Sequence, residues 1–148
     1  MNDTQIIIYE VNESEPLLKE SLNSLSLQLS ASPQLLTDED LYAMFVSPTT
    51  HLFLAKNKES NSIVGMITLV TFRTPYKMKG TIEDFVVDQA SRGQKVGENL
   101  LQRVLQKARD EGVKSLTLTS HPTREAANHL YQSVGFERRD TNVYRITL

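Results

Sequence analysis

The chain has 148 residues, of which 39% are apolar and 23% charged, and this composition is typical of a single globular domain. Cysteine is absent, which excludes a disulfide framework, a thiolate zinc site and a cysteine nucleophile. The net charge of −2 argues against binding driven by neutralisation of phosphates, so we expect no nucleic-acid partner.

The apolar stretches of the chain are short. The longest, Ile63–Phe72, is interrupted by Gly65, Thr68 and Thr71 and falls well below the roughly 20 residues that a membrane span needs. The first residues, Met1–Gln5, contain no basic segment of the kind that opens a signal peptide. The sequence therefore predicts a cytoplasmic protein without a membrane partner.

Charge is distributed unevenly along the chain. Residues 1–55 contain one base, Lys19, and eight acids, so this part carries −7 and residues 56–148 carry +5. The acids are Asp3, Glu10, Glu13, Glu15, Glu20, Asp38, Glu39 and Asp40. Two halves of opposite sign fit two ligands of opposite charge, and they also fit a domain whose charges are scattered without function.

The first part of the chain shows one strand pattern and two helix patterns. The β-branched run Gln5–Val11 predicts a strand. Leucines spaced by three to five residues between Leu17 and Leu29 predict a helix. A second helix is predicted to begin after Thr37, which stands three residues before an acid in a capping pattern, and to end before Pro48.

Three strand patterns then follow one another: His51–Ala55, Ile63–Val70 and Thr81–Val87. The polar run Asn57–Asn61 between the first two is typical of a hairpin. Because strands that are consecutive in sequence usually pair as neighbours, we expect an antiparallel meander.

The apolar periodicity changes to that of a helix after the third of these strands. A stripe of apolar residues from Val96 to Ala108 predicts a helix that Gly112 ends, and Lys114–Thr119 predicts a further strand. The order strand, helix, strand requires a parallel pair and a right-handed crossover.

The last part of the chain predicts a helix over Ala126–Val134, ended by Gly135, and a closing hairpin made of Phe136–Arg139 and Asn142–Leu148. No repeat or linker interrupts the chain. We therefore expect one α/β domain over residues 1–148, with a mixed, mostly antiparallel sheet, a parallel βαβ pair at its centre and flanking helices.

The segment Arg92–Gly97 lies where a predicted strand turns into a predicted helix. Backbone N–H groups and the helix dipole can bind a phosphate at such a turn. A P-loop is excluded because Gly97 is followed by Glu98 and Asn99 rather than by Lys and Ser or Thr. The dinucleotide fingerprint is excluded because it needs three glycines and a later acidic residue.

This turn resembles the diphosphate-binding signature [QR]-x-x-G-x-[GA] of the GCN5-related N-acetyltransferase (GNAT) superfamily. Arg92 matches its first position and Gly97 its last, while Lys95 replaces the inner glycine. A second block, Arg124–Phe136, is similar to the superfamily's N-x-x-A-x-x-[LF]-Y pattern with a following Gly-Phe pair. Its matching residues are Ala127, Leu130, Tyr131, Gly135 and Phe136, and Arg124 stands where Asn is common.

The resemblance implies the GNAT fold and an enzyme that transfers acetyl from acetyl-CoA to a primary amine by direct attack in a ternary complex. N–H groups of Gly93 to Glu98 would hold the diphosphate, and the main chain of Phe85–Val87 would pair with the pantetheine, with the Val86 amide directed at the acetyl oxygen. The implied cofactor-binding residues are Phe85, Val86, Val87, Arg92, Gly93, Gln94, Lys95, Val96, Gly97, Glu98, Asn128 and Tyr131.

Two residues are candidates for proton transfer. Glu83 would act as the base that frees the amine, and Asp84 should point to the opposite face because side chains alternate along a strand. Tyr131 would be the acid for the departing thiolate. The alternatives are a surface carboxylate pair and a core tyrosine. Asn128 either contacts the cofactor or caps its helix.

The histidines, His51, His121 and His129, have no ligand spacing with other His, Asp or Glu, so we expect no metal. Three function classes remain: an enzyme, a non-catalytic acyl-CoA-binding sensor, and an interaction domain that would leave the turn unexplained. Retention of both Glu83 and Tyr131 favours the enzyme.

The sequence leaves the acceptor open among aminosugars, polyamines, amino acids and protein amines, and it leaves a homodimer open. By resemblance, the first two helices form one wall of the acceptor site. Asp38–Asp40 at the second helix would then favour a cationic acceptor, whereas Arg73, Lys77 and Lys79 are the bases available for an anionic one.

Overall fold

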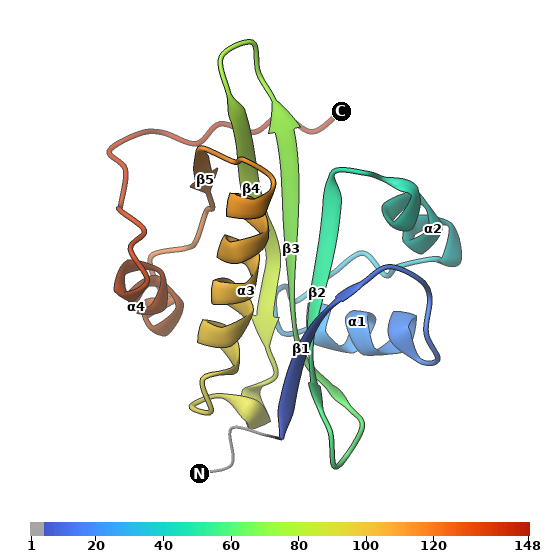
Figure 1. Ribbon diagram of the computed structural model, residues 1–148. Coiled ribbons are helices and arrows are strands. Elements are labelled where there is room, and N and C mark those ends of the chain that lie inside the picture. The colour runs from blue at the N-terminus through green and yellow to red at the C-terminus, as the bar shows by residue number, and fades with distance from the viewer. Residues whose placement is uncertain (1–4) are drawn as a thin grey trace. The chain divides into compact units, whose positions relative to one another are not determined.

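A mixed sheet of five strands, in the order β1-β2-β3-β4-β5, forms the centre of the first part of the chain (Figure 1). The computed structural model describes residues 5–148, which divide into two units, residues 5–118 and residues 119–148. The strands are β1 Ile6–Val11, β2 Thr50–Asn57, β3 Ile63–Arg73, β4 Met78–Val87 and β5 Ser115–Thr117. The helices are α1 Leu18–Ser26, α2 Asp38–Val46, α3 Val96–Asp110 and α4 Glu125–Ser133, and a short 3-10 helix covers Gln89–Ser91.

The pairing of the strands confirms the predicted meander and the predicted parallel pair. β1, β2, β3 and β4 pair antiparallel in succession. β5 returns through α3 to lie parallel to β4, as a strand–helix–strand unit requires. This parallel ladder covers only Lys79–Thr81 of β4. The mixed sheet with flanking helices is the fold class that the sequence predicts.

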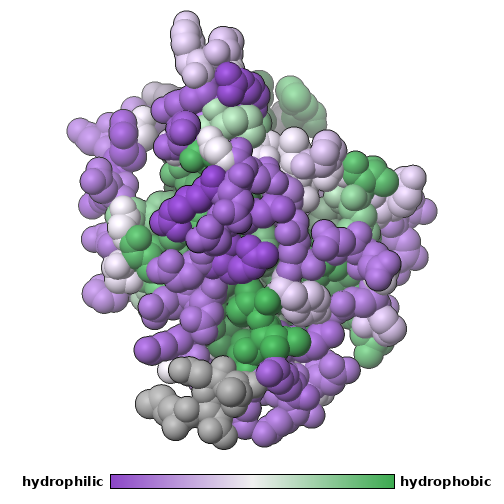
Figure 2. All heavy atoms as spheres, viewed as in Figure 1, coloured by the Kyte–Doolittle hydropathy of each residue, from purple (hydrophilic) through white to green (hydrophobic). Residues whose placement is uncertain are grey.

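The two faces of the sheet in the first unit are covered by different helices. Leu52 and Leu54 of β2 pack in an apolar cluster with Leu18 and Leu22 of α1. Phe53 lies between them in sequence and therefore points to the opposite face, where the Arg103 guanidinium of α3 is 5.1 Å from its ring centroid. α1 and α2 thus cover one face and α3 the other, and the outer side of α3 is largely hydrophilic (Figure 2).

The ends of several helices confirm the expected capping chemistry. Thr37 accepts a hydrogen bond from the backbone N–H of Asp40, whose carboxylate accepts one in return from the Thr37 N–H. Gly112, one residue beyond the last cap of α3, has a φ of 73°. The predicted leucine stripe is wrong at its first member, because Leu17 precedes α1 in a left-handed conformation and is 71% exposed.

The structure corrects two expectations near the C-terminus. β5 has three residues rather than the predicted Lys114–Thr119, and residues 136–148 contain no strand. The predicted closing hairpin is therefore wrong, and β5 is the edge strand of the sheet in the described residues. The parallel pair β4–β5 consequently lies at this edge and not, as expected from the sequence, at the centre of the sheet. An isolated two-stranded hairpin is at best marginally stable, and no strand of the described residues pairs with either predicted run. No helix in residues 5–148 is long and apolar enough to span a membrane.

Candidate functional site

Glu83 lies on β4, two residues after Thr81, the last residue that pairs with β5. It is opposite Thr68 of β3, which in turn is opposite Leu52 of β2. Directly opposite residues share a face, so the Glu83 side chain belongs to the face that α1 and α2 cover. It is exposed and accepts a hydrogen bond from the Thr81 hydroxyl at 2.9 Å. This contact holds the carboxylate along the strand while leaving it accessible.

A β-bulge interrupts β4 immediately after Glu83. The register with β3 shifts between Thr68, opposite Glu83, and Met66, opposite Val86, so β4 carries one extra residue here. Asp84 occupies this bulge with a φ of 49°. The bulge interrupts the regular alternation on which the expected opposite orientation of Asp84 rests, and that orientation stays a prediction.

The Asp84 carboxyl is electrostatically perturbed although the residue is exposed. Partial desolvation of the carboxyl raises its pKa above the ordinary value, and the negative charge of Glu83 raises the pKa further. Two consecutive carboxyl groups thus stand at the bulge, one hydrogen-bonded and one partly desolvated. Sequence reasoning missed this arrangement because a bulge leaves no periodic signal.

The three strand residues expected to meet the pantetheine follow the bulge. Phe85 and Val86 are buried and Val87 is half-buried. The Val86 side chain belongs to the apolar cluster beneath α1. Since the ladder with β5 ends at Thr81, Val86 and Val87 have no partner on β5. Backbone pairing by an extended ligand along this part of β4 is compatible with that geometry.

The turn between β4 and α3 contains two residues with positive φ. Gly93 has a φ of 78°, and Lys95, the residue that caps α3, has φ 60° and ψ 14°. A Cβ at Gly93 would contact nothing within 4 Å, so the conformation rather than space favours glycine there. Lys95 adopts a left-handed conformation that L-residues other than Asn and Asp seldom adopt.

The turn concentrates hydrogen-bond donors at the positive end of a helix. None of the backbone N–H groups from Gly93 to Glu98 donates a hydrogen bond within the described residues, and no side chain caps the start of α3. Arg92 and Lys95 are exposed beside them. Free N–H groups, a helix N-terminus and two bases together suit a diphosphate.

Two side chains fix the start of this turn. Gln28, which follows α1, donates to the Asp88 carboxylate at 3.0 Å and accepts from the Gln89 N–H at 3.0 Å. Arg92 Nε donates to the Val87 carbonyl at 3.4 Å. The turn is therefore held against both α1 and the end of β4.

The second unit contains the other two predicted site residues. Tyr131 on α4 is buried, and its ring meets Phe136 edge-on with centroids 6.1 Å apart. Burial raises the pKa of the Tyr131 phenol, and the nearby Arg124 charge opposes this only in part. The Asn128 amide donates to the carbonyls of His121 and Arg124 at 2.9 and 2.8 Å, so both of its N–H groups stabilise the start of α4.

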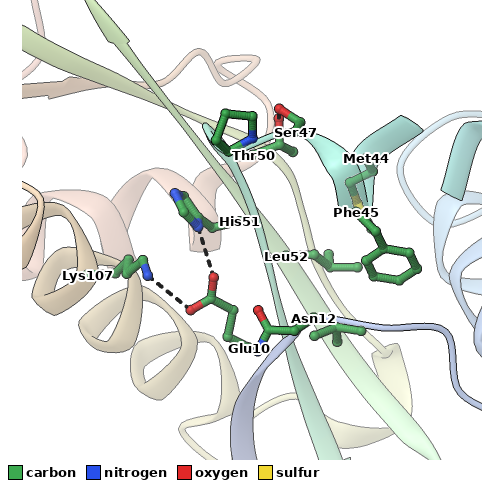
Figure 3. A pocket seen from close by; sticks show the side chains of 11 residues that line it. Glu10, Asn12, Met44, Phe45, Ser47, Thr50, His51, Leu52 and Lys107 are labelled. Carbon is green, nitrogen blue, oxygen red and sulfur yellow. Dashed lines mark hydrogen bonds and ion pairs between the residues drawn. The ribbon is translucent and has the colours of Figure 1, made fainter. Parts of the chain in front are cut away.

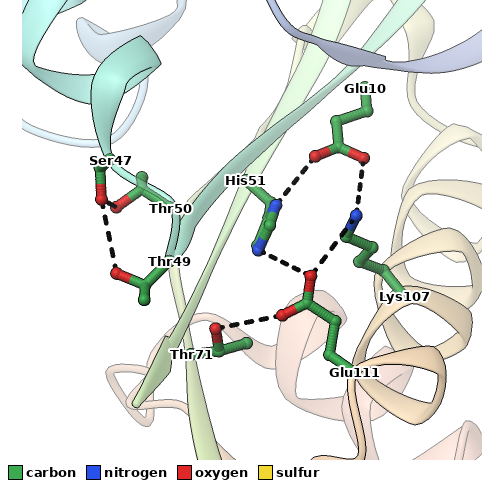
Figure 4. Close-up of polar contacts among 8 residues, drawn as sticks. All are labelled: Glu10, Ser47, Thr49, Thr50, His51, Thr71, Lys107 and Glu111. Carbon is green, nitrogen blue, oxygen red and sulfur yellow. Dashed lines mark hydrogen bonds and ion pairs between the residues drawn. The ribbon is translucent and has the colours of Figure 1, made fainter.

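A cluster of charged, half-buried side chains around the buried His51, which the sequence did not reveal, lies on the α3 face of the sheet (Figure 4). His51 is only 8% exposed, and its Nδ1 is 2.8 Å from Glu10 Oε1. Lys107 Nζ is 3.3 Å from Glu10 Oε2 and 3.5 Å from Glu111 Oε1. Glu111 Oε2 accepts from the Thr71 hydroxyl at 3.3 Å. The i, i+4 spacing of Lys107 and Glu111 was the one sequence signal for it.

Two of the hollows in the first unit are lined entirely by described residues. The first, of about 260 Å³, adjoins this cluster between the end of α2 and the β1–β2 edge (Figure 3). The second, a groove of about 610 Å³, runs between α1 and the β2–β3 hairpin and ends at Asp88. Its charged lining residues are Glu15, Glu20, Asp88 and Lys56. Among the described residues no group of His, Asp and Glu is arranged to hold a metal ion.

The sequence profile described as "Acetyltransferase (GNAT) family" matches residues 18–136. Among curated proteins, N-acetyltransferase 8B of Homo sapiens is 28% identical over 109 residues, which cover 72% of this chain and 48% of that protein. N-acetyltransferase 8F1 of Rattus norvegicus is 28% identical over 83 residues, which cover 55% of this chain and 38% of that protein. The matched part is less than half the length of either relative.

Solved structures share the fold. An aminoglycoside acetyltransferase from an uncultured soil metagenomic sample, in complex with sisomicin, superposes with a TM-score of 0.87 and 19% identity, covering 99% of this chain and 98% of that one. Glucosamine-6-phosphate N-acetyltransferase from Arabidopsis thaliana gives a TM-score of 0.77 with 16% identity, covering 95% of this chain and 98% of the other.

Proposed function

Because the chain belongs to the acetyltransferase (GNAT) family, we propose that it is an acetyl-CoA-dependent N-acetyltransferase that acts on a primary amine. The observation that carries the proposal is the turn between β4 and α3. Its run of N–H groups, from Gly93 to Glu98, donates no hydrogen bond to any part of the chain that the structure describes, and it stands at the positive end of α3 beside two bases. A diphosphate matches that set of donors in charge and in number of acceptors.

The cofactor would lie along β4 and the turn. The N–H groups of Gly93, Gln94, Lys95, Val96, Gly97 and Glu98 would bind the diphosphate, and Arg92 would flank it. The main chain at Phe85–Val87 would pair with the pantetheine, with the Val86 amide polarising the thioester carbonyl. Because both N–H groups of Asn128 already bond to carbonyls, only its side-chain oxygen remains for the cofactor.

Bound acetyl-CoA supplies the thioester, and residues of the chain carry out the proton transfers. Glu83 removes a proton from the acceptor ammonium, directly or through a water, because an alkyl ammonium with a pKa near 10 is mostly protonated at neutral pH. The C–N bond forms as the C–S bond breaks, and Tyr131 donates its phenolic proton to the departing thiolate. A tyrosine phenol is protonated at neutral pH, as a donor requires, and burial raises the pKa of Tyr131 further.

The acceptor wall is expected on the face that α1 and α2 cover, because Glu83 belongs to that face. Acidic side chains gather there: Glu15 and Glu20 line the groove beside α1, and Asp38–Asp40 form the first turn of α2. This supports a cationic amine as acceptor, and aminoglycosides, after the solved structure with that name, belong in the set of amines to be tested.

Two measurements test the proposal. Acetyl-CoA at a hundredfold excess over Kd should stabilise the fold by about 2.7 kcal/mol in a thermal-shift titration. A panel of amines with acetyl-CoA should then release free thiol with at least one acceptor. A stabilised protein that turns over no amine would favour the non-catalytic acyl-CoA sensor, and the absence of any stabilisation would contradict both functions.

A matched pair of variants places the binding at the turn. Gly97→Val should abolish the stabilisation by acetyl-CoA while leaving the fold intact, since a β-branched side chain would occupy the space that the diphosphate needs. Val113→Ala, beyond the far end of α3, should retain it. If acetyl-CoA stabilises the Gly97→Val variant as much as the parent, the diphosphate does not bind at this turn.

A further inference from the structure

Gln28 lies at the C-terminal end of α1 and contacts the start of the turn between β4 and α3, although 60 residues separate it from Asp88 in the sequence. Its amide nitrogen Nε2 donates to Asp88 Oδ1, and its amide oxygen accepts from the Gln89 N–H, both at 3.0 Å. A primary amide suits this double contact because it carries a donor and an acceptor on one carbon. Gln28 therefore joins α1 to two consecutive residues that lead into the turn.

The position of Gln28 is itself fixed by the core. Its N–H donates to the Leu25 carbonyl at 3.0 Å, in the turn that ends α1. Leu18, Leu22 and Leu25 of this helix are buried in one apolar cluster with Val86 of β4. The Gln28 side chain thus reaches the turn from a helix that is anchored on the sheet.

The chain that enters the turn depends on this link. The Asp88 N–H donates to the Val64 carbonyl at 2.8 Å, which ties the end of β4 to β3. The 3-10 helix Gln89–Ser91 follows at once, and the Asp88 side chain does not cap it. Its first N–H is the one that the Gln28 oxygen accepts, so Gln28 supplies from α1 what a capping side chain supplies within a helix.

The N–H groups of the turn can bind one diphosphate only if they converge on it. The buried Val96 fixes them at the α3 end. At the β4 end they are held by Gln28 and by Arg92, whose Nε is 3.4 Å from the Val87 carbonyl oxygen. Both contacts of Gln28 are shorter, and one of them is to a carboxylate, so Gln28 is the stronger of these two anchors.

We propose that Gln28 is a positioning residue for the cofactor: it holds Asp88 and Gln89 so that the N–H groups after them are preorganised for the diphosphate. It acts through these two residues and needs no contact with the cofactor. The inference rests on the proposed function, since it concerns how the same turn binds acetyl-CoA. It adds that α1, a helix expected at the acceptor wall, also supports the cofactor turn.

The test measures the Kd of the full chain for acetyl-CoA by isothermal titration calorimetry. Gln28→Ala should weaken binding about tenfold, because the cofactor must then order the turn as it binds. Gln106→Ala is the matched control and should bind as the parent does, because Gln106 makes a similarly exposed hydrogen bond to Asp110, at 2.9 Å, in the last turns of α3. Equal affinity of the parent and Gln28→Ala would overturn the proposal.

Exchanging the donor and the acceptor separates positioning from a general loss of structure. Gln28→Glu places a second carboxylate beside Asp88 and should weaken binding about tenfold, whereas Asp88→Asn keeps an acceptor for Gln28 and should bind within about twofold of the parent. The double variant restores both hydrogen bonds with reversed roles and has the parental net charge, so its Kd should return to within about twofold of the parent value. Additive effects of the two substitutions would overturn the proposal, because independent changes of charge would produce them.

The parent's own behaviour separates this inference from the proposed function. If the parent binds no acetyl-CoA, both fail; if it binds and Gln28→Ala binds equally well, only this inference fails. With a reactive amine, Gln28→Ala should raise the KM for acetyl-CoA and leave kcat unchanged, as loss of binding alone does. A fall in kcat with an unchanged KM would overturn the positioning role.

Discussion

Lys95 explains in physical terms why a glycine is usual at the inner position of this turn. The residue that caps α3 must adopt φ 60° and ψ 14° so that the chain can enter the helix directly after the turn. For a residue with a Cβ this conformation is unfavourable by about 1–2 kcal/mol. The sequence identified Lys95 as a departure from the pattern, but only the backbone reveals that the departure carries an energetic penalty.

Replacing Lys95 with glycine should therefore raise the free energy of unfolding by about 1 kcal/mol, less than the full conformational penalty because glycine also gains entropy in the unfolded chain. Urea denaturation would measure this. Lys95→Ala, which keeps the Cβ, is the control and should show no such gain. The acetyl-CoA affinity of Lys95→Gly should equal that of the parent if the ammonium faces solvent, and a tenfold loss would instead show that the ammonium contacts phosphate.

Asp84 makes stability depend on pH. Its pKa is raised in the folded protein, so between its unfolded and folded pKa the folded state binds more protons and stability falls as the pH rises. Asp84→Asn should consequently be more stable than the parent at pH 7, and this advantage should shrink as the pH falls toward about 4, the unfolded pKa of Asp. Urea denaturation across that range is the measurement. An advantage independent of pH would contradict the electrostatic origin.

Glu83 and Tyr131 should affect catalysis in different ways. Tyr131→Phe should lower kcat with little change in the KM for acetyl-CoA, as loss of a transition-state interaction does. Glu83→Gln should reduce the rate most at low pH, where the amine is hardest to deprotonate. Steady-state kinetics over a range of pH separates the two effects. If both variants turn over at the parental rate, Glu83 is a surface carboxylate and Tyr131 a core tyrosine, and neither takes part in catalysis.

At the scale of helices and strands, the sequence predicted whatever depends on periodicity and on capping. The meander, the crossover through α3 and the capping box at Thr37 all follow from such patterns within short segments of the sequence. The bulge at Asp84 and the length of β5 are set by the neighbouring strand and not by the strand's own residues. The wrong closing hairpin has the same origin, because an alternating run such as Asn142–Leu148 needs a partner before it forms a strand.

Gly65 determines how closely α3 approaches the sheet. A Cβ there would lie 2.9 Å from Leu100 Cδ1 and 3.3 Å from the Val86 carbonyl oxygen. Gly65→Ala should therefore destabilise the fold by about 1–3 kcal/mol through overpacking, measurable by urea denaturation. Combining it with Leu100→Ala should lose less than the sum of the two single changes, because the closest contact is then removed. Strict additivity would show that the backbone contact dominates.

For the whole molecule, the site divides into a part that the sequence could predict and a part that it could not. The turn from Arg92 to Glu98 is continuous in sequence, so its chemistry can be recognised without a structure. The cluster around His51 is formed by residues from β1, β2, β3 and α3, and no residue spacing in the sequence predicts that these four elements meet. Sequence reasoning finds sites built from one segment far better than sites assembled from several.

The uneven charge of the chain predicts a salt-dependent reaction. If the acidic residues of α1 and α2 attract the acceptor, kcat/KM for a polycationic amine should exceed that for a singly charged amine and should fall as ionic strength rises. Converting Asp38, Glu39 and Asp40 together to their amides should remove the preference. Kinetics at low and high salt would measure both effects.

A control distinguishes the local field from the net charge. Converting Glu13, Glu59 and Glu137 to glutamine changes the total charge equally and should leave the preference in place. A rate independent of salt, or a preference for a phosphorylated amine, would contradict the cationic assignment. In the latter case Arg73, Lys77 and Lys79 of the β3–β4 hairpin would be the bases to examine.

The short ladder between β4 and β5 also has a consequence for the order of folding. β2, β3 and β4 follow one another through short turns, so their contacts close small loops and can form early. β5 can pair with β4 only after the chain of α3 between them has been ordered, and this pairing is stabilised by three residue pairs. We expect β5 to dock last during folding and to detach first during unfolding, whereas the part of β4 along which the cofactor would pair, Phe85–Val87, lies beyond the ladder with β5 and is formed without it.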